Sequence, residues 1–394
     1  MTPAARAQAA IEVLDAVIEA ARGGGAAADT LVARYFKTRR YAGSKDRRAV
    51  RDLVYAAIRR FAEPPDSGRA AMLGLAAAEP ELFAAFDGSP HGPAPVEPAE
   101  MAAPGGTSAM PAWLAARLDP AVAPEEWPAL LERAPLDLRA NRLRGTREEA
   151  LAATGGTATP LSPLGIRLPE GTAVEAMEAW QAGLVEIQDE GSQLLALAGG
   201  AAPDMNVVDL CAGAGGKTLA LAGEMENRGR LVAADVDRGR LARMAPRLAR
   251  AGVSIVETRL LDPGKERGAL ADLAGAADLV LVDAPCSGTG TWRRNPELRW
   301  RLTPKRLEAY VKLQAYLLDL AAELVRPGGA IVYAVCSLLA EEGRGQAEAF
   351  GARSSLAAQT LPVPGGRPAG PGALLTPAHD GTDGFFVARW QAPC

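Results

Sequence analysis

The sequence predicts an α/β fold, in which helices cover both faces of a mostly parallel β-sheet, preceded by an all-α region. From about residue 186, short apolar runs of strand type alternate with helical stretches, and this alternation is typical of a parallel sheet covered by helices. Residues 1–62 instead carry apolar side chains at helical spacing. The chain has 394 residues, 48% of them hydrophobic, which is enough for two or three domains with packed cores.

Composition and spacing divide the chain into four regions. Residues 1–62 are a helical domain, which extends as far as about residue 110 if the next segment belongs to it. Residues 63–110 are rich in proline and glycine and are a connector or the end of that domain. Residues 111–185 are a mixed extension, and residues 186–394 are the α/β domain.

The α/β domain is predicted element by element. Sheets of this kind usually have the strand order 3-2-1-4-5, and their chemistry collects beyond the carboxyl ends of the strands. The turns that follow the strands are therefore the candidate sites. The predicted strands are Asn206–Leu210, Arg230–Asp235, Val253–Leu260, Asp278–Asp283 and Ala330–Val335, and the predicted helices are Lys217–Glu226, Arg238–Gly252 and Thr303–Val325.

Composition argues against several classes of protein. The chain has 43 Lys plus Arg against 47 Asp plus Glu, a net charge of −4, so any nucleic-acid binding must rest on local patches. The sequence has two histidines, His91 and His379, which disfavours serine-hydrolase triads and histidine-rich metal sites. No apolar run approaches the length of a membrane span.

The cysteines indicate free thiols. They stand 75, 50 and 58 residues apart without a Cys-x-x-Cys pair, which disfavours a disulfide framework and a zinc site. We therefore expect a cytoplasmic protein without a bound metal and without a membrane partner. The four cysteines are Cys211, Cys286, Cys336 and Cys394.

Residues 31–60 form a basic block in a chain that is otherwise close to neutral. They hold ten Lys or Arg residues against Asp46 and Asp52, a local charge of +8. Two interpretations stay open: a solvated helix face in an arginine-rich protein, or a patch that faces the phosphates of a nucleic acid.

The turn after the first predicted strand is rich in glycine and ends in Gly216-Lys217-Thr218. A phosphate-binding loop would need glycine where Cys211 stands, and a dinucleotide fingerprint would need glycine at position 218. The turn still lets the backbone approach a ligand closely, and Asp235 ends the next strand, where an acid suits ribose hydroxyls. A nucleoside ligand without a pyrophosphate fits best, and S-adenosylmethionine is the commonest such cofactor on this scaffold.

Two cysteines follow neighbouring strands of the predicted sheet. Cys286 lies in an Asp-Ala-Pro-Cys-Ser-Gly run that starts at Asp283, and Cys336 lies in a Val-Cys-Ser run. Because adjacent strands lie about 4.8 Å apart, both thiols are expected to share one pocket with the methyl group of the cofactor. A single buried cysteine is usually a small apolar residue, but two at adjacent strand ends, each followed by serine, indicate chemistry.

A pair of thiols suits methyl transfer to carbon 5 of cytosine. That carbon becomes nucleophilic when a thiolate adds at carbon 6 and pushes electron density onto carbon 5, which then attacks the sulfonium methyl. The adduct must afterwards lose the carbon 5 proton and expel the enzyme sulfur. An acid near N3 and the exocyclic amine would stabilise the charge shift, and Asp283 lies three residues before Cys286.

These motifs resemble those of the Sun (RsmB-type) RNA cytosine-5 methyltransferases of the Nop2/Sun superfamily, and the resemblance runs through nearly the whole chain. Val207–Thr218 is similar to their cofactor loop, Asp283–Gly288 to their Asp-Ala-Pro-Cys-Ser-Gly motif, and Cys336-Ser337 to their Thr-Cys-Ser motif. Gln188–Ser192 and Asp383–Phe386 also match family stretches. The resemblance implies a Rossmann-like S-adenosylmethionine-dependent methyltransferase domain at 186–394, its family extension at 111–185, and an all-α NusB-like RNA-binding domain before them.

The resemblance also implies catalytic roles by position. Cys336 would be the nucleophile and Cys286 would assist release of the product. Asp283 would contact the target base, and Lys217 would lie beside the cofactor or the base.

For the cofactor, the resemblance implies that Asp235 holds the ribose and Asp262 the adenine end. This chain departs from the family at Gly213-Ala214, where Ala-Pro is usual, at Val335, where Thr is usual, and at Ala340, where Pro is usual. None of these changes removes a reacting group. The expected cofactor-binding residues are Cys211, Ala212, Gly213, Ala214, Gly215, Gly216, Lys217, Asp235, Arg240, Asp262 and Asp283, with no metal ligand.

A second basic segment follows the Cys286 loop. Residues 293–306 hold six basic side chains against Glu297, with Trp292 and Trp300 interleaved. Arginines for phosphates and aromatic faces for unstacked bases suit single-stranded RNA. The alternative is that the tryptophans belong to the core and the arginines to a solvated face.

The expected function is transfer of a methyl group from S-adenosylmethionine to carbon 5 of a cytosine in RNA, in particular small-subunit ribosomal RNA, by a monomeric protein. A transfer RNA is the alternative substrate. Two other functions stay open: a catalytically idle RNA-binding factor of ribosome assembly or antitermination, and a nucleotide-dependent oxidoreductase, whose dinucleotide fingerprint is absent.

Overall fold

The computed structural model describes residues 1–101 and 110–394. They form two compact units. The predicted connector at 63–110 includes residues 102–109, which lie outside the described residues. The helical unit consists of Met1–Arg117, Trp127–Glu132 and Thr291–Pro304, and the α/β unit consists of Leu118–Glu126, Arg133–Gly290 and Lys305–Cys394.

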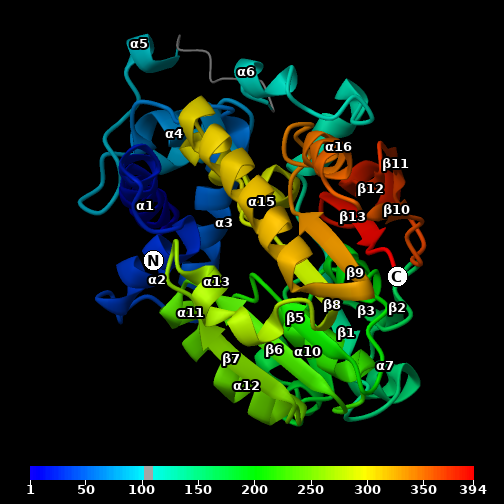
Figure 1. Ribbon diagram of the computed structural model, residues 1–394. Coiled ribbons are helices and arrows are strands. Elements are labelled where there is room, and N and C mark those ends of the chain that lie inside the picture. Colours follow the sequence, from blue (N-terminus) through cyan, green and yellow to red (C-terminus); the bar gives the residue numbers. More distant parts are fainter. Residues whose placement is uncertain (102–109) are drawn as a thin grey trace. The chain divides into compact units, whose positions relative to one another are not determined.

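The first four helices of the chain build most of the helical unit (Figure 1). The Thr2 hydroxyl caps the first helix by accepting from the Ala5 N–H, and Gly24 in the left-handed region ends it. Apolar side chains at helical spacing, such as Leu14 and Val54, meet in the core of this unit. The helices are α1 (Pro3–Gly23), α2 (Ala28–Lys37), α3 (Ser44–Arg60) and α4 (Gly68–Ala76), followed by the short elements η1 (Pro80–Ala85), α5 (Pro98–Met101) and α6 (Ala112–Ala115).

The segment Thr291–Pro304, with the one-turn helix α14 (Leu298–Arg301), belongs to the helical unit. The ring of Trp300 packs into the helical core, and its indole N–H donates to the Phe61 carbonyl at 2.9 Å. Arg299, 2% exposed, donates to the Ile58 carbonyl at 2.6 Å. Carbonyl groups near a helix C-terminus lack intrahelical partners, so guanidinium groups bind well there.

The RNA-contact interpretation of this segment is therefore wrong for its aromatic side chains. Trp292 is 1% exposed and Trp300 is 6% exposed, so neither ring offers a face to an unstacked base. Arg301 donates to the carbonyl groups of Gly25 and Ala26. The alternative is confirmed for the tryptophans, which belong to the core, but it is wrong for Arg293 and Arg299, which are 7% and 2% exposed and do not lie on a solvated face.

The α/β unit begins with a small antiparallel sheet of order β2-β3-β1-β4. Helix α7 (Arg147–Thr154) starts in a capping box, in which the Thr146 hydroxyl accepts from the Glu149 N–H and the Glu149 carboxylate accepts from the Thr146 N–H. Leu138 and Ile166 are buried in the core of this sheet. Its strands are β1 (Leu136–Ala140), β2 (Thr157–Ala158), β3 (Gly165–Leu168) and β4 (Val185–Ile187).

A nine-stranded sheet forms the centre of the α/β unit (Figure 1). Its parallel strands run in the order β7-β6-β5-β8-β9, which confirms the predicted order 3-2-1-4-5. The antiparallel strands β13, β12 and β11 continue it beyond β9, and β10 pairs with β13; these were not predicted. The strands are β5 (Asn206–Asp209), β6 (Arg230–Asp235), β7 (Val256–Leu260), β8 (Ala277–Asp283), β9 (Val325–Val335), β10 (Ala357–Gln359), β11 (Arg367–Ala369), β12 (Gly372–Leu375) and β13 (Phe385–Gln391).

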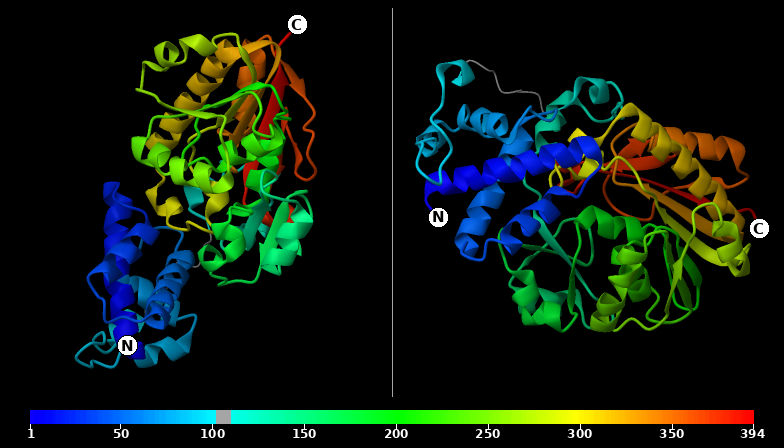
Figure 2. Two further views of the ribbon diagram at one scale, coloured as in Figure 1. Left: turned by 90° about the horizontal axis from the view of Figure 1, so that it is seen from below. Right: turned by 90° about the vertical axis from the view of Figure 1, so that its left-hand side faces the viewer.

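Helices cover the large sheet, as the two views of Figure 2 show. Leu194 and Leu221, from two of them, pack against strand residues such as Val207 and Leu279 in one core. Besides α7, the α-helices of five or more residues in this unit are α9 (Glu190–Leu197), α10 (Gly216–Glu224), α11 (Arg238–Ala242), α12 (Met244–Ala251), α15 (Pro304–Leu324) and α16 (Arg344–Arg353). The remaining short elements are η2 (Pro124–Leu130), η3 (Val174–Ala176), α8 (Glu178–Gln181), α13 (Glu266–Ala269), η4 (Ala271–Leu273), η5 (Thr289–Thr291) and α17 (Pro377–Asp380).

One predicted helix is broken. The stretch Arg238–Gly252 forms α11 and α12, with the break at Arg243. Pro246 lacks an N–H and fits only the first turn of a helix, so a new helix starts shortly before it. In the part of the chain that the structure describes, no helix has the length and apolar character that crossing a membrane requires.

Candidate active site

The structure brings two thiols together where β8 and β9 end. Cys286 follows β8 and Cys336 follows β9, and their Sγ atoms lie 3.3 Å apart. The two strands are parallel neighbours, so their carboxyl ends meet at one edge of the sheet. Both cysteines are free and partly exposed, which leaves them accessible to a ligand.

The environment of the pair keeps one sulfur protonated. The hydrogen bond with Cys336 and, next, burial raise the pKa of Cys286 well above its ordinary value. At neutral pH Cys286 is therefore a thiol that can donate to the neighbouring sulfur. Burial, and then its interaction with Cys286, raise the pKa of Tyr310 on α15; the sequence offered no reason to place this phenol near the thiols.

An ion pair lies beside the thiols. Lys217, in the first turn of α10, places its Nζ 2.7 Å from Oδ2 of Asp283 at the end of β8. Burial, the largest single effect, would lower the pKa of Lys217, but the Asp283 carboxylate, Cys336 and Asp209 together outweigh it, so the pKa is raised. The interaction of Lys217 with Cys336 adds to the rise, which places a lasting positive charge near that sulfur.

The glycine-rich turn is tied to the next strand. Gly213 and Gly215 have φ values of +56° and +85°, a region that glycine enters without strain. The Gly213 N–H donates to Asp235 at 2.7 Å. The guanidinium of Arg240 covers the turn, since a Cβ atom at Gly213 would lie 2.4 Å from its Nη2. The departure at Gly213-Ala214 therefore keeps the backbone donor.

The Asp235 carboxylate holds this turn in place and can still accept further hydrogen bonds from a ligand. Its carboxylate accepts from the N–H groups of Gly213 and Asp237, both at 2.7 Å. Arg240 places Nη1 3.9 Å from Oδ2. Each carboxylate oxygen has a second lone pair, so the group can also accept from the two hydroxyls of a ribose.

The other predicted cofactor residues surround the same turn. Asp262 follows β7 and is exposed, and Ala212 is buried. The Ala214 carbonyl accepts from Arg247 on α12 at 2.7 Å, which ties the turn to that helix. Burial raises the pKa of Cys211 well above its ordinary value, which makes it a neutral thiol.

One buried acid of the turn was missed. Asp209 ends β5 with 0% exposure and accepts from the Thr218 hydroxyl at 2.7 Å. Its other oxygen has no hydrogen-bond partner among the described residues, and burial raises its pKa to about 7. Its place at a strand end, like that of Asp235 and Asp283, was the feature in the sequence that could have identified it.

The charges of the turn select the kind of ligand. Asp209, Asp235, Asp262 and Asp283 end or follow four neighbouring strands, β5, β6, β7 and β8, with Lys217 among them. A polyphosphate would meet several carboxylates there, whereas a cationic sulfonium nucleoside would be attracted. The residues present therefore fit S-adenosylmethionine and disfavour a nucleotide polyphosphate.

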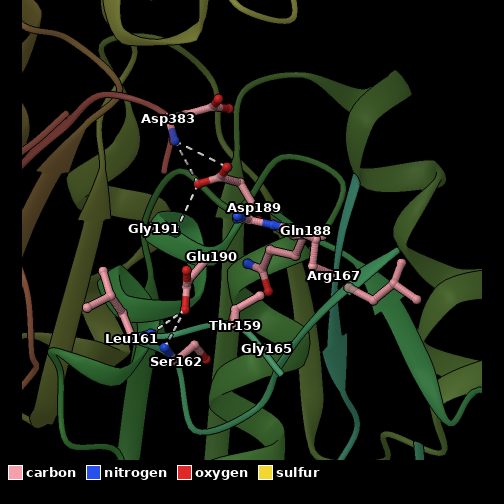
Figure 3. A network of polar contacts seen from close by, with 12 residues as sticks. Thr159, Leu161, Ser162, Gly165, Arg167, Gln188, Asp189, Glu190, Gly191 and Asp383 are labelled. Carbon is pink, nitrogen blue, oxygen red and sulfur yellow. Dashed lines mark hydrogen bonds and ion pairs between the residues drawn. The ribbon is translucent and has the colours of Figure 1, made fainter. Parts of the chain in front are cut away.

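Figure 3 shows a network around the Gln188–Ser192 motif. Asp189 caps α9 by accepting from the Gly191 N–H at 2.9 Å, and it also accepts from the Asp383 N–H at 3.2 Å. Glu190, 0% exposed, accepts from the N–H groups of Leu161 and Ser162 at 2.6 and 2.7 Å. The network thus joins the small sheet and the turn before β13 to α9.

The same turn reaches the loop of Cys286. The Gly384 N–H donates to the Gly290 carbonyl at 2.7 Å, and the Gly290 N–H donates to the Cys336 carbonyl at 3.1 Å. A Cβ atom at Gly290 would lie 1.9 Å from the Gly384 carbonyl oxygen. The close approach of the two backbones therefore requires glycine at both position 290 and position 384, and it joins the turn before β13 to the two cysteine loops.

An arginine of the small sheet supports the glycine-rich turn. Arg139, 4% exposed, donates to the Gly216 carbonyl at 3.1 Å and to the Gln188 side chain. Burial lowers its pKa to about 10, so it stays charged at neutral pH. Sequence reasoning missed this residue because it lies 77 positions from Gly216.

Comparison with known proteins decides the family. The family described as 16S rRNA methyltransferase RsmB/F matches residues 196–391, a range that includes the glycine-rich turn, the ion pair and both thiols. These residues belong to the RsmB/F family. The match confirms the predicted resemblance and the prediction of S-adenosylmethionine as the cofactor.

Curated relatives agree with this match. "Ribosomal RNA small subunit methyltransferase B" of Enterobacter sp. (strain 638) is 36% identical over 291 residues, and that of Salmonella typhi is 34% identical over 290 residues. Each alignment covers 71% of this chain and 65% of the relative. The chain thus spans less than two thirds of the length of the curated relatives it matches.

Solved structures agree in fold. "PH0851" has a TM-score of 0.74 at 22% identity and covers 99% of both chains. "NSun6 from Pyrococcus horikoshii with SFG" has a TM-score of 0.61 at 22% identity, covering 67% of this chain and 92% of that one. Within residues 1–101 and 110–394, no group of three or more His, Cys, Asp or Glu side chains is arranged to hold a metal ion.

Proposed function

We propose that this chain transfers the methyl group of S-adenosylmethionine to carbon 5 of a cytosine in RNA, in particular RNA of the small ribosomal subunit. The observation that carries this proposal is the pair of thiols 3.3 Å apart at adjacent strand ends, beside the Lys217–Asp283 ion pair. A reaction that needs one sulfur to add and another to help release the product explains why two thiols meet there.

The reaction assigns one task to each group. Cys336 is the nucleophile: its Sγ–C6 bond to the cytosine forms first, and Lys217 stabilises the thiolate. Asp283 contacts the amine and N3 edge of the base and stabilises the shift of charge. S-adenosylmethionine supplies an electrophilic methyl group when bound.

The second half of the reaction releases the product. The C5–H bond breaks and its proton passes to water. Its electron pair re-forms the C5–C6 double bond and expels the Cys336 sulfur from carbon 6 as a thiolate, which can take a proton from the Cys286 thiol. Cys286 assists this release, because its sulfur lies 3.3 Å from the one that must leave. Its raised pKa makes it a proton carrier rather than a competing nucleophile.

Transfer of label tests the proposed function. Purified protein, incubated with S-adenosylmethionine tritiated in the methyl group and small-subunit ribosomal RNA that lacks the modification, should place tritium in 5-methylcytosine after nuclease digestion. Labelled RNA of another chemistry, or RNA that binds without any transfer, would contradict the proposal; the latter is expected of an idle assembly factor.

Asp235→Asn should weaken S-adenosylmethionine binding by about 1–3 kcal/mol. Both oxygens of Asp235 accept backbone N–H groups, so an amide NH2 would face one of these donors and could not accept from a ribose hydroxyl. Isothermal calorimetry measures the change, with Asp319→Asn in an exposed ion pair on α15 as the control. Unchanged affinity of Asp235→Asn would remove this residue from the cofactor site.

Neutralising the basic block should weaken RNA binding without affecting the cofactor. Arg40, Arg47 and Arg48 are exposed, whereas Arg39 pairs with Glu12 at 3.2 Å. Replacing the four arginines by Gln should lower RNA affinity. The slope of log K against log salt concentration should become less negative by about 0.7–0.9 for each phosphate that the variant no longer neutralises. Filter binding at several salt concentrations measures both.

The control for this prediction is a variant that loses a similar amount of positive charge outside the basic block. Arg133, Arg228 and Arg326 carry side chains that are 55%, 58% and 48% exposed, outside the basic block. If their replacement by Gln changes the salt slope as much as the four-arginine variant, the block has no special role in RNA binding.

A further inference from the structure

A buried carboxylate lies between the two cysteine loops. Glu342, in the loop between β9 and α16, is 0% exposed. Its two oxygens accept four hydrogen bonds, and the backbone carbonyl of the same residue accepts from the Tyr333 hydroxyl at 2.6 Å. The four donors are the Ser287 N–H, the Ser287 hydroxyl, the Ser337 hydroxyl and the side-chain amide of Gln314.

The two serines are the residues that directly follow the two cysteines. Their hydroxyl oxygens lie 3.1 Å apart, and both donate to Oε2 of Glu342, that of Ser337 at 2.5 Å. Oε1 accepts from the Ser287 N–H at 2.9 Å. One carboxylate thus holds the residue next to each thiol, which explains why a serine follows both cysteines.

Further hydrogen bonds connect the carboxylate and the two serines to neighbouring residues of both loops. The Gln314 amide donates to Oε1 of Glu342 at 3.0 Å and to the Pro285 carbonyl at 2.9 Å. The Thr289 hydroxyl lies 3.2 Å from that of Ser337 and accepts from the Leu338 N–H at 2.9 Å. Both loops are therefore anchored on the same carboxylate.

The carboxylate is suited to this role because two of its donors, the Ser287 N–H and the Gln314 amide, are held by the backbone and by helix α15. Four donors satisfy a buried negative charge. Removing the acceptor would leave several buried donors unsatisfied, and the loops would move to find other partners. The charge of Glu342 also adds to the rise in the pKa of Cys286.

We propose that Glu342 is a positioning residue that clasps the loops of Cys286 and Cys336 and holds the two sulfurs within 3.3 Å of each other. Its consequence for catalysis rests on the proposed function, since the two sulfurs must act in turn on one base. The clasp itself is a property of the fold and can be tested without RNA or cofactor.

Oxidation by diamide tests the clasp directly. Diamide takes up two electrons and two protons from a pair of thiols, and the disulfide forms at a rate that depends on how closely the sulfurs are held. In a Cys394→Ser background, the Cys286–Cys336 disulfide is followed by mass spectrometry of proteolytic fragments. Glu342→Ala should slow its formation by about 10²-fold, the effect of an error of about 1 Å in position.

Two further variants sharpen the test. Glu342→Gln keeps one acceptor for the Ser287 and Gln314 N–H groups, and its amide can donate to the two serine hydroxyls, which can rotate; it should oxidise at close to the wild-type rate. Glu348→Gln, an exposed glutamate on α16, is the matched control. If Glu342→Ala does not fold, Ser337→Ala removes one donor, and slower oxidation in that variant supports the clasp.

The outcomes separate the clasp from the proposed function. Folded Glu342→Ala or Ser337→Ala that oxidises at the wild-type rate overturns the clasp, whatever the enzyme does to RNA. Slower oxidation in a protein whose wild type fails to methylate RNA supports the clasp and overturns the proposed function. If the clasp and the proposed function both hold, Glu342→Ala should lower kcat and leave S-adenosylmethionine affinity unchanged, because the glycine-rich turn and Asp235 follow β5 and β6. An unchanged kcat would overturn the catalytic consequence of the clasp.

Discussion

Cys336→Ala should reduce methyl transfer by at least roughly 10⁴-fold, the scale seen when a covalent nucleophile is removed. Without this sulfur, carbon 5 of the cytosine never gains the electron density it needs. Neither methylated RNA nor a protein–RNA adduct should form. Tritium transfer to RNA measures the first, and denaturing electrophoresis of labelled RNA measures the second.

The variant should keep its cofactor site. The glycine-rich turn and Asp235 are held by contacts that do not involve Cys336, so S-adenosylmethionine affinity should match that of the wild type. Cys394→Ala, at an exposed thiol, is the control. Methyl transfer by Cys336→Ala at even a tenth of the wild-type rate would show that another group is the nucleophile.

Cys286→Ala should give the opposite result, an adduct that accumulates. Addition by Cys336 and methyl transfer remain possible, but the sulfur that assists release is missing. A protein band linked to RNA should therefore survive denaturing electrophoresis, and turnover should fall by about 10²–10⁴-fold, the range for loss of a general acid or base. The double variant should lose the band.

The two single variants also test the assignment of roles. If Cys336→Ala traps the adduct and Cys286→Ala cannot form it, the roles of the two cysteines are reversed. If neither variant changes methylation, the covalent route is wrong, and the pair at 3.3 Å would then be a feature of packing.

The parallel part of the sheet could be predicted because its strands and helices alternate locally. The order β7-β6-β5-β8-β9 follows from that alternation. The antiparallel strand β13 was missed because its pairing with β9 joins residues such as Phe386 and Val335, which lie 51 positions apart. No local pattern shows such a pairing.

The cysteine pair was predictable because strand ends meet at one edge of a parallel sheet. Glu342 was not, because its partner Ser287 lies 55 positions away and the contact depends on the path of both loops. Trp300 was misread for a related reason: an aromatic residue among arginines suggests RNA, yet its ring fills a core formed by helices about 240 positions earlier. The residue types of a segment indicate a binding surface only when their side chains are known to be exposed.

The most direct test of the proposed chemistry is a trap with RNA that contains 5-fluorocytosine. Fluorine at carbon 5 leaves no proton to remove after methyl transfer, so the enzyme sulfur stays bound to carbon 6. Wild-type protein, this RNA and S-adenosylmethionine are incubated, digested with protease and nuclease, and the linked peptide is sequenced by mass spectrometry. We predict a methylated fluoropyrimidine nucleotide on Cys336. A link to Cys286, or a modified nucleotide with no linked peptide, would contradict Cys336 as the nucleophile of a cytosine-5 methyltransferase.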